Sequence, residues 1–362
     1  MLTQEQLFAA LAAVTDPNTG KDFVSTKAIK NVQITGDDVA FDVELGYPAK
    51  SQIPAIRKSL INAAKALPNV GNVSVNVGVK IASHSVQRGV QLLPNVKNII
   101  AVASGKGGVG KSTTAVNLAL ALAAEGASVG LLDADIYGPS QPMMMGIEGR
   151  PESVDGKNME PMENYGIQVM SIGFLVAQDE AMIWRGPMAT QALEQLLRQT
   201  NWRDLDYLIV DMPPGTGDIQ LTLSQRVPMT GAVIVTTPQD IALLDAKKGI
   251  KMFEKVGVPI LGIVENMAVH ICSQCGHAEH IFGADGGKKM AAEYKMDYLG
   301  ALPLDMQIRL QADNGRPTVV ADPDGDVAAL YKAVARKVAI TVAAKSKDFS
   351  AKFPTITISK NT

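Results

Sequence analysis

The sequence has little cysteine and almost no excess charge, and each shortage excludes a class of protein. Two cysteines in 362 residues are too few for a disulfide framework, so we expect a reducing, cytoplasmic compartment. The net charge of -2 lacks the basic excess that a nucleic-acid-binding surface needs. No apolar run is long enough to span a bilayer, and the N-terminal residues show no secretory signal. We therefore expect neither nucleic acid nor membrane among the partners.

The chain is long enough for two domains, since 46% of its residues are hydrophobic and can form ample core. Residues 1–80 predict a small α+β domain that lacks cysteine and histidine, so it has poor means to hold a metal. The expected elements of this domain are a helix over 4–14, strands over 29–35 and 39–45, a helix over 48–66 and a strand over 70–79.

The rest of the chain predicts an α/β domain with a mostly parallel sheet. Residues 81–95 are expected to form a linker with His84 on its surface. Residues 96–345 alternate strand and helix patterns, and each apolar run ends in polar or turn residues. The carboxyl ends of such strands are where open α/β sheets bind ligands. Residues 346–362 predict a polar C-terminal tail.

A glycine-rich stretch between a strand and a helix dominates this second domain. The apolar run Ile99–Val102 predicts a buried strand, and the spacing in Ala115–Ala124 predicts a helix. This context is typical of a phosphate-binding loop, whose backbone N–H groups and helix N-terminus attract anions. Lys111 can then reach the β- and γ-phosphates, and the Ser112 hydroxyl can bind Mg²⁺. The predicted nucleotide-binding residues of the loop are Gly105, Lys106, Gly107, Gly108, Val109, Gly110, Lys111, Ser112 and Thr113.

Carboxylates follow two of the predicted strands. Asp211 comes directly after the apolar run 207–210, the place of the aspartate that holds Mg²⁺ through water in phosphate-loop enzymes. Asp133 and Asp135 end the run 128–132 and, two residues apart, point to the same side. Asp135 is predicted to polarise the attacking water and Asp133 to lie at the nucleotide site. The alternative for Asp133 is a turn or helix cap.

Both cysteines of the protein lie in one short segment, Cys272-Ser273-Gln274-Cys275. The spacing lets both thiolates bind one metal ion or one cluster. A 4Fe–4S cluster takes four thiolates, so two chains would have to face each other. Cys272, Cys275, His277 and His280 could instead hold one zinc ion within one chain. The residues alone leave these two possibilities open.

Several motifs together resemble a known family. The run Lys-Gly-Gly-Val-Gly-Lys-Ser, with its extra Lys106, is the deviant Walker A form. With the segments 133–140, 211–218 and 264–267, it makes residues 96–317 similar to the Mrp/ApbC group of the MinD/ParA-like (SIMIBI) P-loop ATPases. Residues 1–80 resemble the small iron–sulfur-assembly domain that precedes many Mrp-type proteins.

The resemblance implies specific roles. Lys106 would reach the nucleotide of a partner subunit, Lys111 the phosphates in its own subunit, and Asn266 the adenine base. Ser112 and Asp211 would serve Mg²⁺, and Asp135 the water. The family's Cys-x-x-Cys-Gly followed by Ile-Phe-Gly is matched at 272–276 and 281–283, which favours the cluster; Ser273 departs from the proline common there.

The expected function is therefore that of an ATP-hydrolysing iron–sulfur cluster carrier. It would hold a 4Fe–4S cluster, through Cys272 and Cys275, at a homodimer interface and pass it to apo-proteins, after loading from an assembly scaffold. Its expected cofactors are ATP, Mg²⁺ and the 4Fe–4S cluster. The alternative is a MinD/ParA-like positioning ATPase with a structural zinc site.

Overall fold

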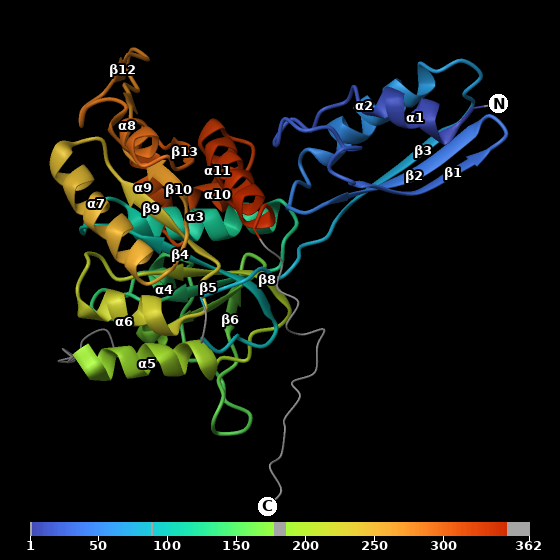
Figure 1. The fold of residues 1–362 in the computed structure, drawn as a ribbon. Helices are drawn as coiled ribbons and strands as arrows, with labels where there is room; N and C mark the ends of the chain where they lie inside the picture. Colours follow the sequence, from blue (N-terminus) through green and yellow to red (C-terminus); the bar gives the residue numbers. More distant parts are fainter. Residues whose placement is uncertain (1, 88–89, 177–185, 346–362) are drawn as a thin grey trace, which may run out of the picture.

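The computed structural model describes residues 2–87, 90–176 and 186–345, so the predicted tail 346–362 lies outside the described residues. The chain forms a small α+β unit and a larger α/β unit (Figure 1). Within the described ranges, no helix is long and apolar enough to cross a membrane.

The small unit is a three-stranded sheet covered by two helices. Strands β1 (Ile29–Thr35), β2 (Asp38–Leu45) and β3 (Val73–Val79) lie in the order β1-β2-β3, antiparallel then parallel. Helix α1 (Gln4–Leu11) begins with a capping box, in which the Thr3 hydroxyl accepts from the Gln6 N–H. Helix α2 (Ile53–Lys65) contacts β3 and buries Ile56 and Leu60.

The large unit contains an eight-stranded sheet with the order β13-β10-β9-β4-β8-β5-β7-β6. Every pairing in it is parallel except that of β6 with β7. Its strands are β4 (Val96–Ala103), β5 (Val129–Asp133), β6 (Met162–Asn164), β7 (Ile167–Ser171), β8 (Leu205–Asp211), β9 (Gly231–Thr236), β10 (Ile260–Glu265) and β13 (Tyr298–Ala301).

Helices cover both faces of this sheet. Helices α3, α10 and α11 pack together against it, while α5 and α6 lie on its other side in the view of Figure 1. The described helices of this unit are α3 (Lys111–Ala124), α4 (Gln141–Met144), α5 (Gly186–Arg198), α6 (Asp218–Arg226), α7 (Asp240–Lys255), α8 (Gly286–Glu293), α9 (Met306–Asp313), α10 (Thr318–Ala321) and α11 (Asp326–Ala343). The mostly parallel α/β fold predicted from the sequence is confirmed.

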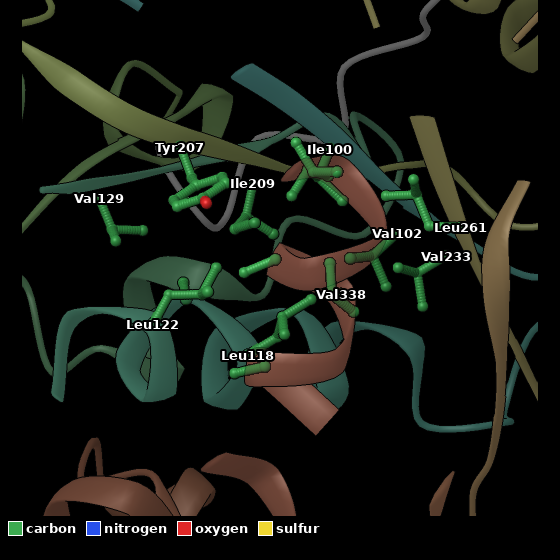
Figure 2. Close-up of a cluster of buried hydrophobic side chains, with 14 of the residues drawn as sticks. Ile100, Val102, Leu118, Leu122, Val129, Tyr207, Ile209, Val233, Leu261 and Val338 are labelled. Carbon is green, nitrogen blue, oxygen red and sulfur yellow. The ribbon is translucent and has the colours of Figure 1, made fainter. Parts of the chain in front are cut away.

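Helix α3 is buried on nearly all sides. Figure 2 shows Leu118 and Leu122 of this helix against Ile209 of β8 and Val338 of α11. Because sheet and helix enclose α3 from two directions, it is apolar around most of its circumference rather than along one stripe. The loop that precedes α3 is therefore attached to one of the most firmly packed elements of the chain.

The segment between the two units does not behave as a free linker. The prediction that His84 lies at the surface is wrong: it is 2% exposed, and its Nδ1 lies 3.0 Å from Oδ1 of Asn98 on β4. The Asn98 amide also donates to the Ala82 carbonyl. Ile81 and Leu93 are buried as well, so this polar-looking segment is anchored by two apolar side chains that composition alone did not reveal.

The small unit contacts the large one at the C-terminal end of α3. The Glu125 carbonyl accepts from the Lys50 N–H at 3.0 Å. The Glu125 carboxylate, 1% exposed, accepts from the Ser51 hydroxyl at 2.7 Å and from Nη1 of Arg336 at 2.5 Å. Arg336 Nε also donates to the Asn18 side chain. One buried carboxylate thus connects α3, α11 and the small unit.

Candidate functional site

At two glycines of the loop between β4 and α3, there is no room for a Cβ atom. Gly110 caps the start of α3 with φ of 78°, and a Cβ there would lie 2.2 Å from Nδ2 of Asn266. A Cβ on Gly105 would lie 2.1 Å from the main chain of Asp245. Glycines at such positions let a phosphate-binding loop curl tightly around an anion.

The loop borders a cavity of about 320 Å³. Lys106, Gly107, Gly108, Gly110, Lys111, Ser112 and Thr113 line it, together with Asp135 from the segment after β5. Of the other predicted loop residues, Gly105 packs against Asp245 and Val109 is buried. The start of α3 faces this space, so its partial positive charge favours a phosphate there.

Lys111 lies at the centre of the charged groups. It is buried, and its Nζ donates to Oδ1 of Asp211 at 2.6 Å and lies 3.7 Å from Oδ2 of Asp135. The structure therefore brings together the predicted phosphate lysine and two predicted carboxylates. A phosphate bound by Lys111 would have to compete with Asp211 for the ammonium group.

Asp133 and Asp135 have different surroundings although they are only two residues apart. Asp133 is fully buried and accepts from the N–H groups of Ser140 and Gln141 and from the Ser171 hydroxyl. Burial, with the nearby Asp211 charge, raises the pKa of Asp133 to about 7. Burial also raises the pKa of Asp135. Asp133 does not line the cavity, and its contacts brace the segment after β5.

The residues around Asp211 fit a magnesium ion. Mg²⁺ prefers oxygen ligands and retains several waters, and the Ser112 hydroxyl and the Asp211 carboxylate supply oxygens next to the cavity. Oε1 of Gln141 is buried nearby without a hydrogen-bond partner. Such an atom is the acceptor that a metal-bound water can satisfy. The donor set therefore matches the predicted Mg²⁺ site.

Asn266 follows β10 and contacts the phosphate loop from the side. Its Nδ2 donates to the Val109 carbonyl at 2.9 Å, and its main-chain N–H donates to the Thr236 carbonyl. It does not line the cavity. An asparagine amide has two N–H groups and an oxygen, so one N–H and the oxygen remain for the predicted contact with adenine.

The two cysteines lie at the tip of a short hairpin. Strands β11 (His270–Ile271) and β12 (Ala278–Glu279) form it, and the Gly276 N–H donates to the Cys272 carbonyl across the turn. Both thiols are free; Cys275 is exposed and Cys272 half-buried. The N–H groups of Gln274 and Cys275 lower the pKa of Cys272. The pair is accessible, and the lowered pKa of Cys272 favours the thiolate form that metals bind.

The histidines near the hairpin do not complete a mononuclear site. Nδ1 of His270 lies 2.9 Å from the Leu304 carbonyl, and Nδ1 of His280 lies 2.7 Å from the Ala268 carbonyl. In the ranges that the structure describes, no three histidine, cysteine or carboxylate side chains are grouped to hold a metal ion. The zinc alternative therefore gains no support from a preformed site.

The nucleotide residues and the cysteine hairpin lie along the same edge of the sheet. The phosphate loop follows β4 and the hairpin follows β10, with β9 between them. Two strand spacings correspond to roughly 10 Å. The Asn266–Val109 hydrogen bond joins the phosphate loop to the segment that connects β10 to the hairpin.

Sequence reasoning missed two residues of the site. Gln141 opens α4, and its Nε2 donates to Oδ2 of Asp211 at 2.8 Å and to the Ser112 carbonyl at 3.1 Å. Ser171, at the end of β7, donates to Asp133. The one signal in the sequence was the position of Gln141 in the polar segment after Asp133, where nothing distinguishes it from a turn residue.

Comparison with known proteins matches both units of the chain. Residues 95–339 match the family described as NUBPL iron-transfer P-loop NTPase, and residues 4–77 match the family described as iron-sulfur cluster assembly protein. The "Iron-sulfur cluster carrier protein" of Pseudomonas fragi is 61% identical over 75% of this chain and 96% of its own. The protein of the same name from Escherichia coli K12 is 51% identical over 91% of this chain and 89% of its own.

Solved structures agree with these matches. A nucleotide-binding protein from Archaeoglobus fulgidus, determined in complex with ADP, is 39% identical, with a TM-score of 0.56 over 64% of this chain and 90% of its own. The cell division ATPase MinD of Pyrococcus furiosus is 22% identical, with a TM-score of 0.50 over 67% of this chain and 98% of its own. The second likeness concerns the fold alone.

Proposed function

This chain belongs to the NUBPL iron-transfer P-loop NTPase family, and from that membership we propose that it is an ATP-hydrolysing carrier that receives an iron–sulfur cluster and delivers it to apo-proteins. Relatives at 51% and 61% identity bear the name iron-sulfur cluster carrier protein. The observation that carries the proposal is the position of an accessible Cys-x-x-Cys hairpin on the same sheet edge as the phosphate loop.

In the proposed nucleotide site, this chain supplies positive charge for the phosphates and side chains that position the metal and the attacking water. Lys111 leaves Asp211 to bind the β- and γ-phosphates, and the loop N–H groups enclose them. Ser112 and Asp211 would hold Mg²⁺, which neutralises phosphate charge when bound. Asp135, which lines the cavity, orients the attacking water. Lys106 lines the same cavity and is proposed to reach the nucleotide of a second copy.

In this proposal the cluster is the cargo of the protein, and the number of its ligands determines how many copies of the chain assemble around it. One chain provides two thiols, Cys272 and Cys275, whereas a 4Fe–4S cluster takes four. Two copies related by a twofold axis provide all four from the same surface patch. A cluster held at an exposed hairpin by two thiolates from each chain remains open to attack by the thiols of an acceptor.

The proposed partners follow from this chemistry. They are a second copy of the chain, an assembly scaffold that donates the cluster, and apo iron–sulfur proteins that accept it. The free thiols fit a reducing, cytoplasmic compartment. The match of residues 4–77 to an iron-sulfur cluster assembly family supports a docking role for the small unit in loading or delivery.

A transfer experiment tests the proposal. The full chain is purified anaerobically, reconstituted with iron and sulfide, and mixed with an apo-enzyme whose activity requires a 4Fe–4S cluster. We expect the acceptor to gain activity while the carrier loses its cluster absorbance, with Cys275→Ser as the inactive control. The proposal is overturned if the purified chain carries one zinc per chain that depends on His277 and His280 and takes up no cluster.

A further inference from the structure

Gln141 contacts three parts of the nucleotide site at once. It is completely buried at the start of α4. Its side-chain Nε2 donates to Oδ2 of Asp211 and to the Ser112 carbonyl, while its main-chain N–H donates to Oδ2 of Asp133 at 3.1 Å. One residue thus ties the end of β8 to the first turn of α3 and to the end of β5.

We propose that Gln141 is a positioning residue that fixes the Asp211 carboxylate in the orientation needed for Mg²⁺ when Lys111 turns to the nucleotide. The inference rests on the proposed nucleotide site and adds a residue to it. It does not depend on the cysteine hairpin or on cluster transfer.

The two oxygens of the Asp211 carboxylate have different partners. Oδ1 accepts from Lys111, and Oδ2 accepts from Gln141. When Lys111 moves to the phosphates, Oδ1 loses its donor and becomes available, whereas Oδ2 keeps the Gln141 amide. The carboxylate therefore cannot rotate freely, and its open oxygen stays on the side from which Lys111 departed.

An amide suits this position better than a charged or apolar side chain. Lys111 already faces both Asp211 and Asp135, so a glutamate would add one more negative charge to a buried carboxylate cluster. A leucine would leave Oδ2 of Asp211 buried without a donor. Glutamine donates to the carboxylate and still presents Oε1, which is buried and without a partner, as an acceptor for a metal-bound water.

Nucleotide binding measured with and without Mg²⁺ tests this role. The probe is a fluorescent, non-hydrolysable ATP analogue, titrated against the full chain in Mg²⁺ and again in EDTA. In Gln141→Leu we expect affinity in EDTA to stay within about twofold of wild type, because Lys111 and the loop N–H groups are intact. The gain on adding Mg²⁺ should fall about tenfold, the scale of one hydrogen bond to a charged group.

Gln141→Asn, which retains an amide one methylene shorter, should also lose the Mg²⁺ effect, because its amide no longer reaches Asp211. The matched control is Gln168→Leu on β7, since the side chain of this buried glutamine bonds to the main chain of Arg203, away from the cavity. That variant should melt earlier yet keep the Mg²⁺ effect. A folded Gln141→Leu or Gln141→Asn protein with the wild-type Mg²⁺ effect overturns the inference. Wild-type protein that binds no nucleotide overturns the proposed function instead.

Discussion

The Lys111 ammonium lies 2.6 Å from Oδ1 of Asp211, and both side chains are buried. The residue predicted to hold phosphate and the residue predicted to hold magnesium are thus each other's partners. In the proposed site, nucleotide binding exchanges this contact for two others, Lys111 to phosphate and Asp211 to the metal shell. The phosphate would neutralise the Lys111 ammonium that Asp211 no longer pairs with, and the metal would neutralise the Asp211 carboxylate that Lys111 leaves.

Lys111→Ala should lower ATP turnover by about a hundredfold or more, because the lysine offsets charge that develops on the transferred phosphoryl group. Phosphate release by the purified variant measures this. The control is Lys97→Ala, which removes an ion pair of the same 2.6 Å length to Asp206 from an exposed site and should change little. Unchanged turnover in Lys111→Ala would remove the nucleotide-site assignment.

Lys106→Ala should bind ATP yet hydrolyse it poorly if its side chain acts on the nucleotide of a second copy. The sharper test mixes two inactive variants, Lys106→Ala and Lys111→Ala. A mixed dimer has one site with both lysines, so random pairing should restore about a quarter of wild-type turnover. No recovery on mixing, with dimers verified by light scattering, would contradict action between subunits.

Cys272→Ser and Cys275→Ser should each abolish the reconstituted cluster, because by symmetry each change removes two of four ligands. Wild type should contain about four irons per dimer, measured with sulfide after anaerobic purification. Both variants should still bind ATP, since the phosphate loop follows another strand. His277→Ala and His280→Ala serve as controls and should keep their iron; a loss in either would point back to a zinc-type site.

Asp133→Asn should alter how stability depends on pH. Burial raises the folded pKa of Asp133 from its ordinary 3.8 to about 7, so the folded chain holds this proton more tightly than the unfolded chain. Its contribution is complete below the ordinary pKa and is lost as pH rises through about 7. Between about pH 5 and pH 8, the melting temperature of wild type should fall relative to that of Asp133→Asn.

The exposed Asp155→Asn provides the comparison for this series. Main-chain N–H groups lower the pKa of Asp155, so its small contribution has the opposite sign and grows as pH rises above its folded pKa. If wild type and Asp133→Asn show the same pH trend, Asp133 is ionised in the folded chain over this range, and its pKa is not raised by burial.

Much of the fold could be predicted because local patterns and tertiary packing agree. Strand β1 spans Ile29–Thr35 as expected, and strand β2 (Asp38–Leu45) begins one residue before its predicted span. The short pieces were missed. Helix α4 has four residues and β6 has three, too few for a hydrophobic period to appear, and their positions depend on contacts distant in sequence.

In the site, too, residues in local motifs could be predicted, whereas residues placed by contacts distant in sequence could not. The loop residues and Asp211 could be identified from the sequence because each follows a strand in a recognisable pattern. The structure brings Lys111, Asp135 and Asp211 together. Gln141 could not be found in that way, because its role arises from a contact 70 residues away in the chain. The prediction that His84 is exposed was wrong for a related reason, since its burial comes from packing onto β4.

The hydrogen bond from Asn266 to the Val109 carbonyl has a thermodynamic consequence. Six residues after Asn266 the chain reaches Cys272, so this bond is a short mechanical path from the phosphate loop to the hairpin. Linkage between two binding sites is reciprocal. In the proposed carrier, any factor by which ATP changes the affinity for the cluster is also the factor by which the cluster changes the affinity for ATP. Coupling along this path would therefore give a loaded carrier and an empty one different affinities for nucleotide.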